Sequence, residues 1–308
     1  MTPAYLSLYE RGELSPRVEA ALAMLHDCHL CPHECRVDRT AGKLGRCRTG
    51  RRAVVSSVGA HFGEESPLVG WGGSGTVFLA NCNLACLFCQ NHDISHGGHG
   101  REYSPRALAQ AMLRLQEEGC HNTNFVTPTH VMPQILEALL EAVEGGLRVP
   151  LVWNCGGYES LASLRLLDGI VDIYMPDVKY GDAAIAERLS GCRDYPTHAF
   201  AALREMHRQV GDLRVNDRGV AERGLLVRHL VLPHGLAGTP EVMRLLASLS
   251  PNTYVNVMAQ YRPCHRADEE PRLTRGLTVA EYESAVRVAL DAGLTRLDER
   301  PLRRLAIR

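Results

Sequence analysis

The sequence predicts an α/β protein in which six consecutive β-α units form a partial (β/α)6 barrel behind a small N-terminal module of four cysteines. Short apolar segments begin at residue 76, and each is followed by a longer segment with helical features. Helix-length connections between strands are typical of a parallel sheet, because short hairpins cannot join parallel strands. Close-spaced cysteines before residue 50 predict the metal-binding module.

The predicted strands and helices alternate along the chain. Ser104-Pro105 and Thr239-Pro240 are typical helix starts, because serine and threonine cap helices and proline suits the first turn. Strands are expected at residues 76–80, 122–127, 149–155, 171–177, 225–233 and 254–260. Further helices are expected around residues 136–143, 159–167 and 279–292, and between the strand 171–177 and a point just past Met206.

Length and composition narrow the class of protein. A chain of 308 residues with 45% hydrophobic residues can bury a full core. No apolar run reaches about 18 residues, and Glu10 and Glu13 stand early in the chain, so we expect no membrane span, no signal peptide and a cytoplasmic location. The 34 basic and 35 acidic residues leave a net charge of −1 without a basic run, which argues against nucleic acid as a partner.

The N-terminal cysteines form a complete set of four thiol ligands. Cys28, Cys31 and Cys35 lie close together, and Cys47 follows after a loop that contains glycine. Four thiolates bind one zinc ion or hold a second iron–sulfur cluster, and the spacing is compatible with both. Buried cysteines without a metal are the alternative. Metal ligation needs reduced thiols, which predicts a reducing compartment.

Two domains are expected. Residues 1–54 comprise a helix opened by Ser15-Pro16 and the four-cysteine module, which is too short to fold well without a metal. Residues 55–308 comprise the partial barrel with a C-terminal extension. The segment 70–75 matches G-x-G-x-x-G, but it precedes a strand where a dinucleotide-binding loop follows one, so we interpret it as a flexible lead-in.

A second group of cysteines follows the first barrel strand. Cys82, Cys86 and Cys89 lie on one short loop. A [4Fe–4S] cluster normally takes four cysteines, so three thiolates either need a fourth from elsewhere or leave one iron open for another ligand. A zinc site and uncoordinated buried thiols are the alternatives.

Polar and charged residues recur where the predicted strands end. The carboxyl ends of parallel strands share one face, so we expect these side chains to converge on the face that carries the second cysteine group. Asparagine and threonine also favour strand ends and helix caps without any function. The residues in question are Asn81, Asn124, Thr127, His130, Asn154, Cys155, Asp177, Lys179, Arg228, Gln260 and Arg262.

Two charged residues, Lys179 and Glu64, are candidates for the active site for additional reasons. Lys43 and Lys179 are the only lysines of the chain, so Lys179 stands where a compact ammonium is needed, or forms a surface ion pair with Asp177. Glu64 and Glu65 precede the barrel, and Glu64 is our candidate for an active-site carboxylate. Solvated surface charges are the alternative for both glutamates.

The second cysteine group resembles the signature of the radical S-adenosylmethionine (SAM) superfamily. Its pattern C-x-x-x-C-x-φ-C, in which φ is aromatic, is matched by Cys82, Cys86, Phe88 and Cys89. Other segments look like the group labelled homologues of the pyruvate formate-lyase activating enzyme, and this resemblance covers nearly the whole chain. The segments are 124–130, 172–179, 205–211, 228–233 and 260–264.

This resemblance implies a radical SAM barrel and its chemistry. In the family, the open iron of a [4Fe–4S] cluster binds SAM, and one electron from a flavodoxin- or ferredoxin-like donor cleaves the sulfonium. The resulting 5′-deoxyadenosyl radical abstracts hydrogen from a substrate. Asp177 with Lys179 and Arg228 match residues that hold SAM, and Phe88 matches the residue that packs on its adenine. A monovalent cation is implied beside the SAM carboxylate, near Met175 and Asp177.

The chain also departs from the activating enzymes. Those enzymes carry Gly-Gly-Glu after the second strand for the SAM amino group, whereas this chain has Asn124 to Thr127. They carry an Asp-Thr pair where this chain has Asn154-Cys155. We take Asn124, Thr127 and Asn154 as SAM-binding candidates, with Asn154 also beside the implied cation. The departures do not favour a glycyl radical enzyme as the substrate.

Three functions compete at this point. One is an activase that abstracts hydrogen from a glycine of a glycyl radical protein. The second is a small-molecule enzyme that epimerises or dehydrogenates a polyol-like compound. The third is a non-enzymatic electron carrier or adaptor, which would need neither an open iron nor the charged residues at the strand ends.

Cys264 is a candidate hydrogen donor for the second function. It follows the sixth predicted strand, and the proline before it biases Arg262 away from helix, which gives the loop a fixed direction. A thiol over the barrel mouth would return hydrogen to a substrate radical in an epimerisation. A small buried thiol without a role is the alternative, and Cys155 and Cys192 are competing donors.

Overall fold

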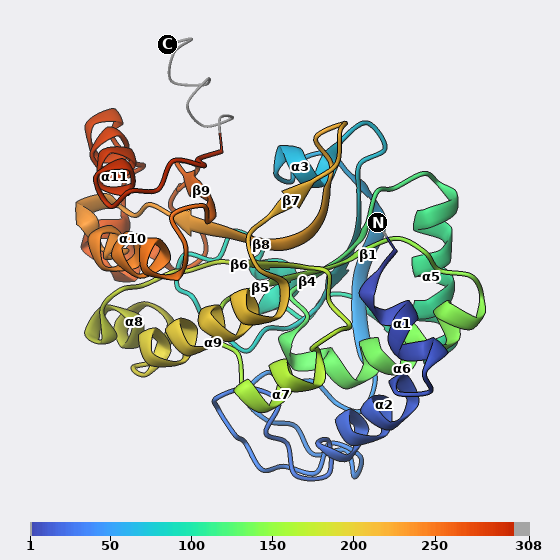
Figure 1. The fold of residues 1–308 in the computed structure, drawn as a ribbon. Coiled ribbons are helices and arrows are strands. Elements are labelled where there is room, and N and C mark those ends of the chain that lie inside the picture. Colours follow the sequence, from blue (N-terminus) through green and yellow to red (C-terminus); the bar gives the residue numbers. More distant parts are fainter. Residues whose placement is uncertain (1, 299–308) are drawn as a thin grey trace.

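Six parallel strands form the centre of the protein, whose computed structural model describes residues 2–298 (Figure 1). Their order in space equals their order in sequence, and neighbouring strands are parallel throughout. The sheet is open, because β9 pairs with β8 and not with β2 in the described chain. The strands are β2 (Ser74–Leu79), β4 (Thr123–Val126), β5 (Leu151–Cys155), β6 (Ile173–Pro176), β8 (Ala221–Leu230) and β9 (Tyr254–Met258). This architecture confirms the predicted partial (β/α)6 barrel.

Helices follow the parallel strands and lie around the sheet (Figure 1). The side chain of Ser104 accepts a hydrogen bond from the Ala107 amide, and Thr278 forms a reciprocal capping box with Glu281. These contacts satisfy amides that the first turn of a helix leaves unbonded. The helices are α5 (Pro105–Glu117), α6 (Met132–Glu144), α7 (Leu161–Leu166), α8 (Ala183–Ser190), α9 (Tyr195–Val210), α10 (Thr239–Leu249) and α11 (Val279–Asp291).

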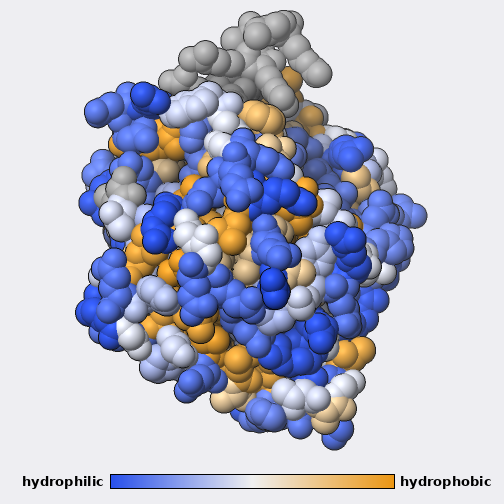
Figure 2. All heavy atoms as spheres, turned by 90° about the vertical axis from the view of Figure 1, so that its right-hand side faces the viewer, coloured by the Kyte–Doolittle hydropathy of each residue, from blue (hydrophilic) through white to orange (hydrophobic). Residues whose placement is uncertain are grey.

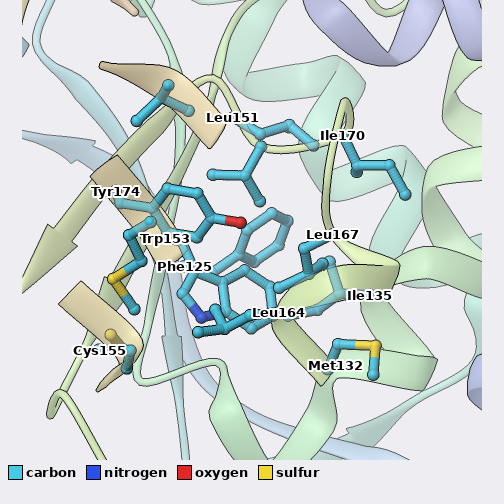
Figure 3. Close-up of a cluster of buried hydrophobic side chains, with 14 of the residues drawn as sticks. Phe125, Met132, Ile135, Leu151, Trp153, Cys155, Leu164, Leu167, Ile170 and Tyr174 are labelled. Carbon is cyan, nitrogen blue, oxygen red and sulfur yellow. The ribbon is translucent and has the colours of Figure 1, made fainter. Parts of the chain in front are cut away.

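The main core lies between the outer face of the sheet and these helices. Figure 3 shows Phe125, Trp153 and Tyr174, which come from three adjacent strands, packed with Ile135 of α6 and Leu164 of α7. All five side chains are buried. Successive side chains of a strand point to opposite faces. The residues next to these aromatics therefore point into the barrel, and they include Asn124 of β4 and Asn154 of β5 as well as the apolar Met175 of β6.

Three strands that the sequence pattern did not predict extend the sheet. β1 (Ala53–His61) pairs antiparallel with β2, and β3 (Arg101–Tyr103) pairs antiparallel with β1. β7 (Arg214–Val215) pairs antiparallel with β8. β1 consists largely of small and half-buried residues, so it gave no apolar signal. The predicted boundary between residues 54 and 55 falls inside this strand, and the division into two domains stays a prediction.

The N-terminal segment packs against the outer helices of the barrel. α1 (Ala4–Glu10) was not predicted, and α2 (Leu14–Ala23) begins one residue before the expected Ser15-Pro16 start. The hydroxyl of Tyr5 donates to the carbonyl oxygen of Val149, at 2.9 Å, just before β5. Side chains of both helices belong to the same buried cluster as those of α6 and α7.

Short elements complete the described chain. The segment 70–75 is not a loose lead-in, because β2 already begins at Ser74 and the amides of Trp71 and Gly72 donate to the His121 ring. The end of the described chain returns to the sheet, where Leu297 bridges Val255 of β9. The remaining short helices are α3 (Ser66–Val69), α4 (His92–Ser95), η1 (Thr129–Val131), η2 (Pro233–Gly235), η3 (Ala267–Glu269) and η4 (Pro271–Leu273).

The outer surface is largely hydrophilic on the side that Figure 2 shows, which is the right-hand side of Figure 1. Hydrophobic residues appear there in smaller areas between charged and polar ones. This pattern is expected for helices that bury one face against a sheet. Within residues 2–298, no helix combines the length and the apolar composition that crossing a bilayer requires.

Candidate active site

A cavity of about 260 Å³ lies at the carboxyl ends of the parallel strands. One part of its wall is the loop with the second cysteine group, and another part is a set of polar and charged strand-end residues. Ligands of open parallel sheets bind at this end of the strands. The strand-end residues that line it are Asn81, Thr127, Asn154, Asp177, Lys179, Arg228 and Gln260.

The loop that follows β2 turns sharply as it leaves the strand. Asn81 adopts a left-handed backbone conformation with a φ of 69°, which asparagine tolerates better than most residues. Its side-chain amide donates to the hydroxyl of Thr49 at 3.2 Å. Cys82, Cys86 and Cys89 come next, and all three line the cavity.

Each sulfur of this loop has a polar neighbour. The Leu84 amide donates to Cys82 Sγ at 3.4 Å, and the Ser190 hydroxyl donates to Cys86 Sγ at 3.0 Å. The Ser95 hydroxyl lies 3.1 Å from Cys89 Sγ. Such hydrogen bonds favour thiolates, which are the form that binds metals. Burial has the opposite effect and raises the pKa of Cys82 to about 12, so metal binding there releases a proton.

Phe88 lies in the same loop and lines the cavity. Its buried ring meets the rings of Tyr180 and Tyr261 edge to face, with centroids 6.4 Å and 6.0 Å away. Edge-to-face pairs hold an aromatic ring in a defined orientation. Phe88 therefore offers a fixed apolar surface beside the cysteine sulfurs.

The charged part of the wall is an ion-pair network. Lys179 Nζ lies 2.9 Å from Asp177 Oδ2, and Arg228 Nε lies 2.7 Å from Asp177 Oδ1. Arg228 Nη2 donates to Asn154 Oδ1 at 2.7 Å. Burial alone would raise the pKa of Asp177, but the charges of Arg228 and Lys179 outweigh it and lower that pKa to about 2. The carboxylate is therefore ionised at any working pH.

Two buried glutamates complete the network on the side of Arg228 and Asn154 that lies away from the cavity. Arg228 Nη1 donates to Glu64 Oε2 at 3.1 Å, and Asn154 Nδ2 lies 3.5 Å from Glu64 Oε1. Asn256 of β9 donates to Glu65 Oε1 at 2.8 Å. Both glutamates are buried, but neither lines the cavity. Burial raises the pKa of Glu64 to about 7, against the opposing charge of Arg228.

Comparison with known proteins decides the family. Residues 76–224 match the model of the radical SAM superfamily. The chain is also 34% identical over 286 residues to an uncharacterized protein of Methanocaldococcus jannaschii, an alignment that covers 90% of this chain and 78% of the relative. The chain belongs to the radical SAM superfamily. This membership implies a [4Fe–4S] cluster, SAM and an enzyme that uses radical chemistry, with a reductant such as flavodoxin or ferredoxin.

Two solved structures are similar to this radical SAM protein. HydG, a maturase of the [FeFe]-hydrogenase, superposes with a TM-score of 0.51 and 12% identity, over 72% of this chain and 50% of HydG. A radical SAM methyltransferase from Sphaerobacter thermophilus gives a TM-score of 0.45 and 17% identity, over 71% of this chain and 64% of the methyltransferase. The chain thus spans half to two thirds of the length of these neighbours. The likeness to HydG concerns the fold.

The second cysteine group fits the cluster that the family implies. Three thiols on one loop line an open cavity and receive hydrogen bonds, and the rest of the wall supplies charges of both signs. Lys179 also lowers the pKa of the Cys82 and Cys86 thiols, although burial has the larger and opposite effect. We therefore keep Cys82, Cys86 and Cys89 as the proposed cluster ligands.

Other predicted site residues lie away from the cavity wall. Asn124 is buried inside the barrel, one layer below the mouth, where its amide donates to Ser74 Oγ at 3.2 Å. Met175 packs in an apolar layer with Val152 and Ile173. Their proposed contacts with SAM and a monovalent cation stay predictions. The oxygens of Asn154 and Asp177 that face this region already accept hydrogen bonds from Arg228.

Cys264 lies on the loop that follows β9 and is half-buried. This loop is bound to the second cysteine group, because the Arg266 amide donates to the Leu87 carbonyl oxygen at 2.9 Å. Gln90 Nε2 also donates to the Gln260 carbonyl oxygen at 3.1 Å. Cys264 itself does not line the cavity, so its role as a hydrogen donor stays a prediction.

The structure also reveals contacts that the sequence did not predict. Ser190 and Ser95 bond two of the loop sulfurs, and Asn256 holds Glu65. Ser190 stands 104 residues from Cys86, so no local pattern connects them. Ser95 ends the short helix α4, which has no apolar period that a sequence reading would detect.

We predict that Lys179→Ala weakens SAM binding at least tenfold in protein that carries its cluster, with little effect on unfolding. The ammonium is partly exposed to the cavity and would lose a charged hydrogen bond to the SAM carboxylate, which contributes about 1.5 to 3 kcal/mol. Isothermal titration calorimetry measures the affinity. Lys43→Ala, at the exposed second lysine, is the control and should bind SAM normally. Equal affinities for both variants would show that Lys179 only forms an ion pair.

We also predict that Glu64→Gln changes the pH dependence of thermal stability. The folded-state pKa of about 7 exceeds the ordinary value of 4.5, so the folded wild type binds more protons than the unfolded chain between these values. The wild type should therefore lose stability relative to the glutamine variant as the pH rises from 4.5 to about 7. The melting temperatures should diverge by roughly 5 °C over this range.

The matched control for this measurement is Glu19→Gln, at an exposed glutamate of α2. Its melting temperature should stay parallel to that of the wild type at every pH. A constant difference between wild type and Glu64→Gln from pH 4.5 to 7 would contradict the raised pKa of Glu64.

Proposed function

We propose that this radical SAM protein cleaves SAM reductively beside a [4Fe–4S] cluster held by Cys82, Cys86 and Cys89. We further propose that it abstracts hydrogen from a C–H bond of a small-molecule substrate. The observation that carries the proposal is the single cavity that joins these three thiols to Asp177 and Lys179. The proposed cluster ligands and the residues proposed to bind the zwitterion thus line the same cavity.

When bound, the [4Fe–4S] cluster and SAM supply the difficult chemistry, which is one-electron cleavage of the SAM sulfonium to a 5′-deoxyadenosyl radical. The side chains of this protein bind and orient the ligand. Lys179 provides a positive charge for the SAM carboxylate, and the Thr127 hydroxyl is available for hydrogen bonding. The fixed ring of Phe88 provides an apolar surface for the adenine. Asp177 holds Lys179 in place and stays ionised.

Two observations favour a small-molecule substrate over a glycyl radical protein. Where the activating enzymes carry Gly-Gly-Glu, this chain has a segment that includes Asn124 and Thr127. Asn124 is buried below the cavity, and Thr127 has no charge. The loop after β9 is bound to the cysteine loop through Gln260 and Arg266, so it restricts access from that side. A polyol-like compound, epimerised or dehydrogenated, remains our proposed substrate class. Membership of an enzyme superfamily argues against a pure electron carrier.

We predict that the anaerobically reconstituted, dithionite-reduced protein converts SAM to 5′-deoxyadenosine and methionine, as measured by liquid chromatography. Alanine at Cys82, Cys86 or Cys89 should abolish this product, because each loss removes one iron ligand. Cys120→Ala, at a buried cysteine of the main core, is the matched control and should keep the activity. No deoxyadenosine from a sample with a full cluster would contradict the proposal.

Isotope transfer can identify the class of substrate. An extract of cells grown in deuterated medium is separated into a small-molecule fraction and a macromolecular fraction, and each is added to the reduced protein with unlabelled SAM. We expect deuterium in 5′-deoxyadenosine with the small-molecule fraction, because the radical takes hydrogen directly from its substrate. Deuterium transfer from the macromolecular fraction alone would instead identify an activase.

A further inference from the structure

We propose that the N-terminal cysteines bind one zinc ion, not a second cluster, and that the zinc-bound module holds the cysteine loop of the active site in place through His33. The four-cysteine module is defined here as residues 28–47. Its loops lie beside α2 and α7, outside the barrel (Figure 1). The first part of the proposal concerns metal content alone. The second part rests on the cluster site of the proposed function.

The size of the second cavity argues for a single ion. Cys28, Cys31, Cys35 and Cys47 all line one cavity of about 10 Å³. A cavity of roughly 10–15 Å³ holds no more than one water-sized particle. A cluster of eight atoms would need far more space. The cavity beside the other cysteine group measures about 260 Å³ and has that space.

The surroundings of these sulfurs suit thiolate ligands. The Arg46 amide donates to Cys35 Sγ at 3.3 Å. Gly45 allows the chain to approach, since a Cβ there would lie 2.8 Å from Cys35 Sγ. Backbone amides directed at sulfur stabilise its negative charge.

A buried cation offsets part of the charge that such a site carries. Zinc with four thiolates has a net charge of about −2. Arg39 lines the same cavity, and this residue is 1% exposed. It is held there by bonds to the carbonyl oxygens of His130, at 2.8 Å, and Gly50, at 2.7 Å.

The four thiols do not yet surround a common point. Within residues 2–298, no group of three or more His, Cys, Asp or Glu side chains stands in a finished metal-binding arrangement. Binding therefore requires the thiols to draw together around the ion. Because the module has few apolar side chains of its own, this closure would fix its loops.

His33 connects the module to the active-site loop. It lies between Cys31 and Cys35, and its Nε2 is 2.7 Å from the carbonyl oxygen of Asn83, the residue after Cys82. Asn83 is 1% exposed, and its amide donates to the Tyr158 carbonyl oxygen at 2.8 Å. The backbone next to a proposed cluster ligand is thus held by a side chain from between two proposed zinc ligands.

The ring of His33 has little freedom to leave this contact. It meets the Tyr158 ring edge to face, with centroids 5.2 Å apart. Cys192 Sγ lies 3.8 Å from Nε2 on the same side. The Nε2 position of the ring therefore stays within hydrogen-bonding distance of the Asn83 carbonyl oxygen. His33 is therefore a positioning residue for the loop of Cys82.

Metal analysis tests the first part of the proposal. The full-length protein, purified anaerobically and reconstituted, should contain one zinc and four irons per chain. Replacing Cys28 and Cys47 together with serine should remove the zinc. Eight irons, or five irons without zinc, would overturn the single zinc ion. This result does not depend on whether SAM is cleaved, so it is separate from the test of the proposed function.

Cluster stability tests the second part. His33→Ala should bind zinc and four irons, but lose its cluster absorbance several-fold faster than wild type when a chelator is added. His33→Gln, which can still donate an N–H to Asn83, should restore much of the lifetime. His29→Ala is the control, because that ring contacts the Asp27 carbonyl oxygen within its own loop. Equal lifetimes for His33→Ala and His29→Ala would overturn the positioning role.

Discussion

The structure of the active site depends on one buried cation, Arg228. Its guanidinium binds Asp177 at the end of β6, Asn154 on β5 and Glu64 from the segment before α3. A charge inside a barrel is stable only when each of its donors has a partner, and removing one partner leaves another charge buried without compensation. The contacts of Arg228 therefore fix the relative positions of three strands and of the segment that fills the barrel beneath them.

In this arrangement the two cations of the cavity, Arg228 and Lys179, differ in what they are free to bind. The donors of Arg228 are largely committed to protein oxygens, which makes it mainly a structural centre. Lys179 donates a hydrogen bond to Asp177 and lies at the cavity wall, so it is better placed to meet an incoming carboxylate. The resemblance to activating enzymes assigned both residues to SAM. We propose that they have different tasks within the same network.

Local patterns predicted the parallel strands and most helices, because apolar runs and caps such as Ser104 report directly on local structure. They also predicted which strand ends meet, since parallel strands share one face. They could not predict how deep each residue lies. Asn124 and Asn154 look equivalent in sequence, yet Asn124 sits one layer below the mouth and Asn154 lines it. Contacts such as Ser190 with Cys86 depend on the complete fold.

The antiparallel strand β1 has a consequence for the shape of the barrel. A strand has two edges, and β2 uses one for β4 and the other for β1. No edge of β2 is left for β9, and β9 itself is bridged by Leu297 beside Val255. Hydrogen bonding thus forbids the ring of strands from ever closing. The gap between β9 and β2 is therefore a permanent part of the architecture, and near the barrel mouth it is spanned by hydrogen bonds between the loop after β9 and the cysteine loop after β2.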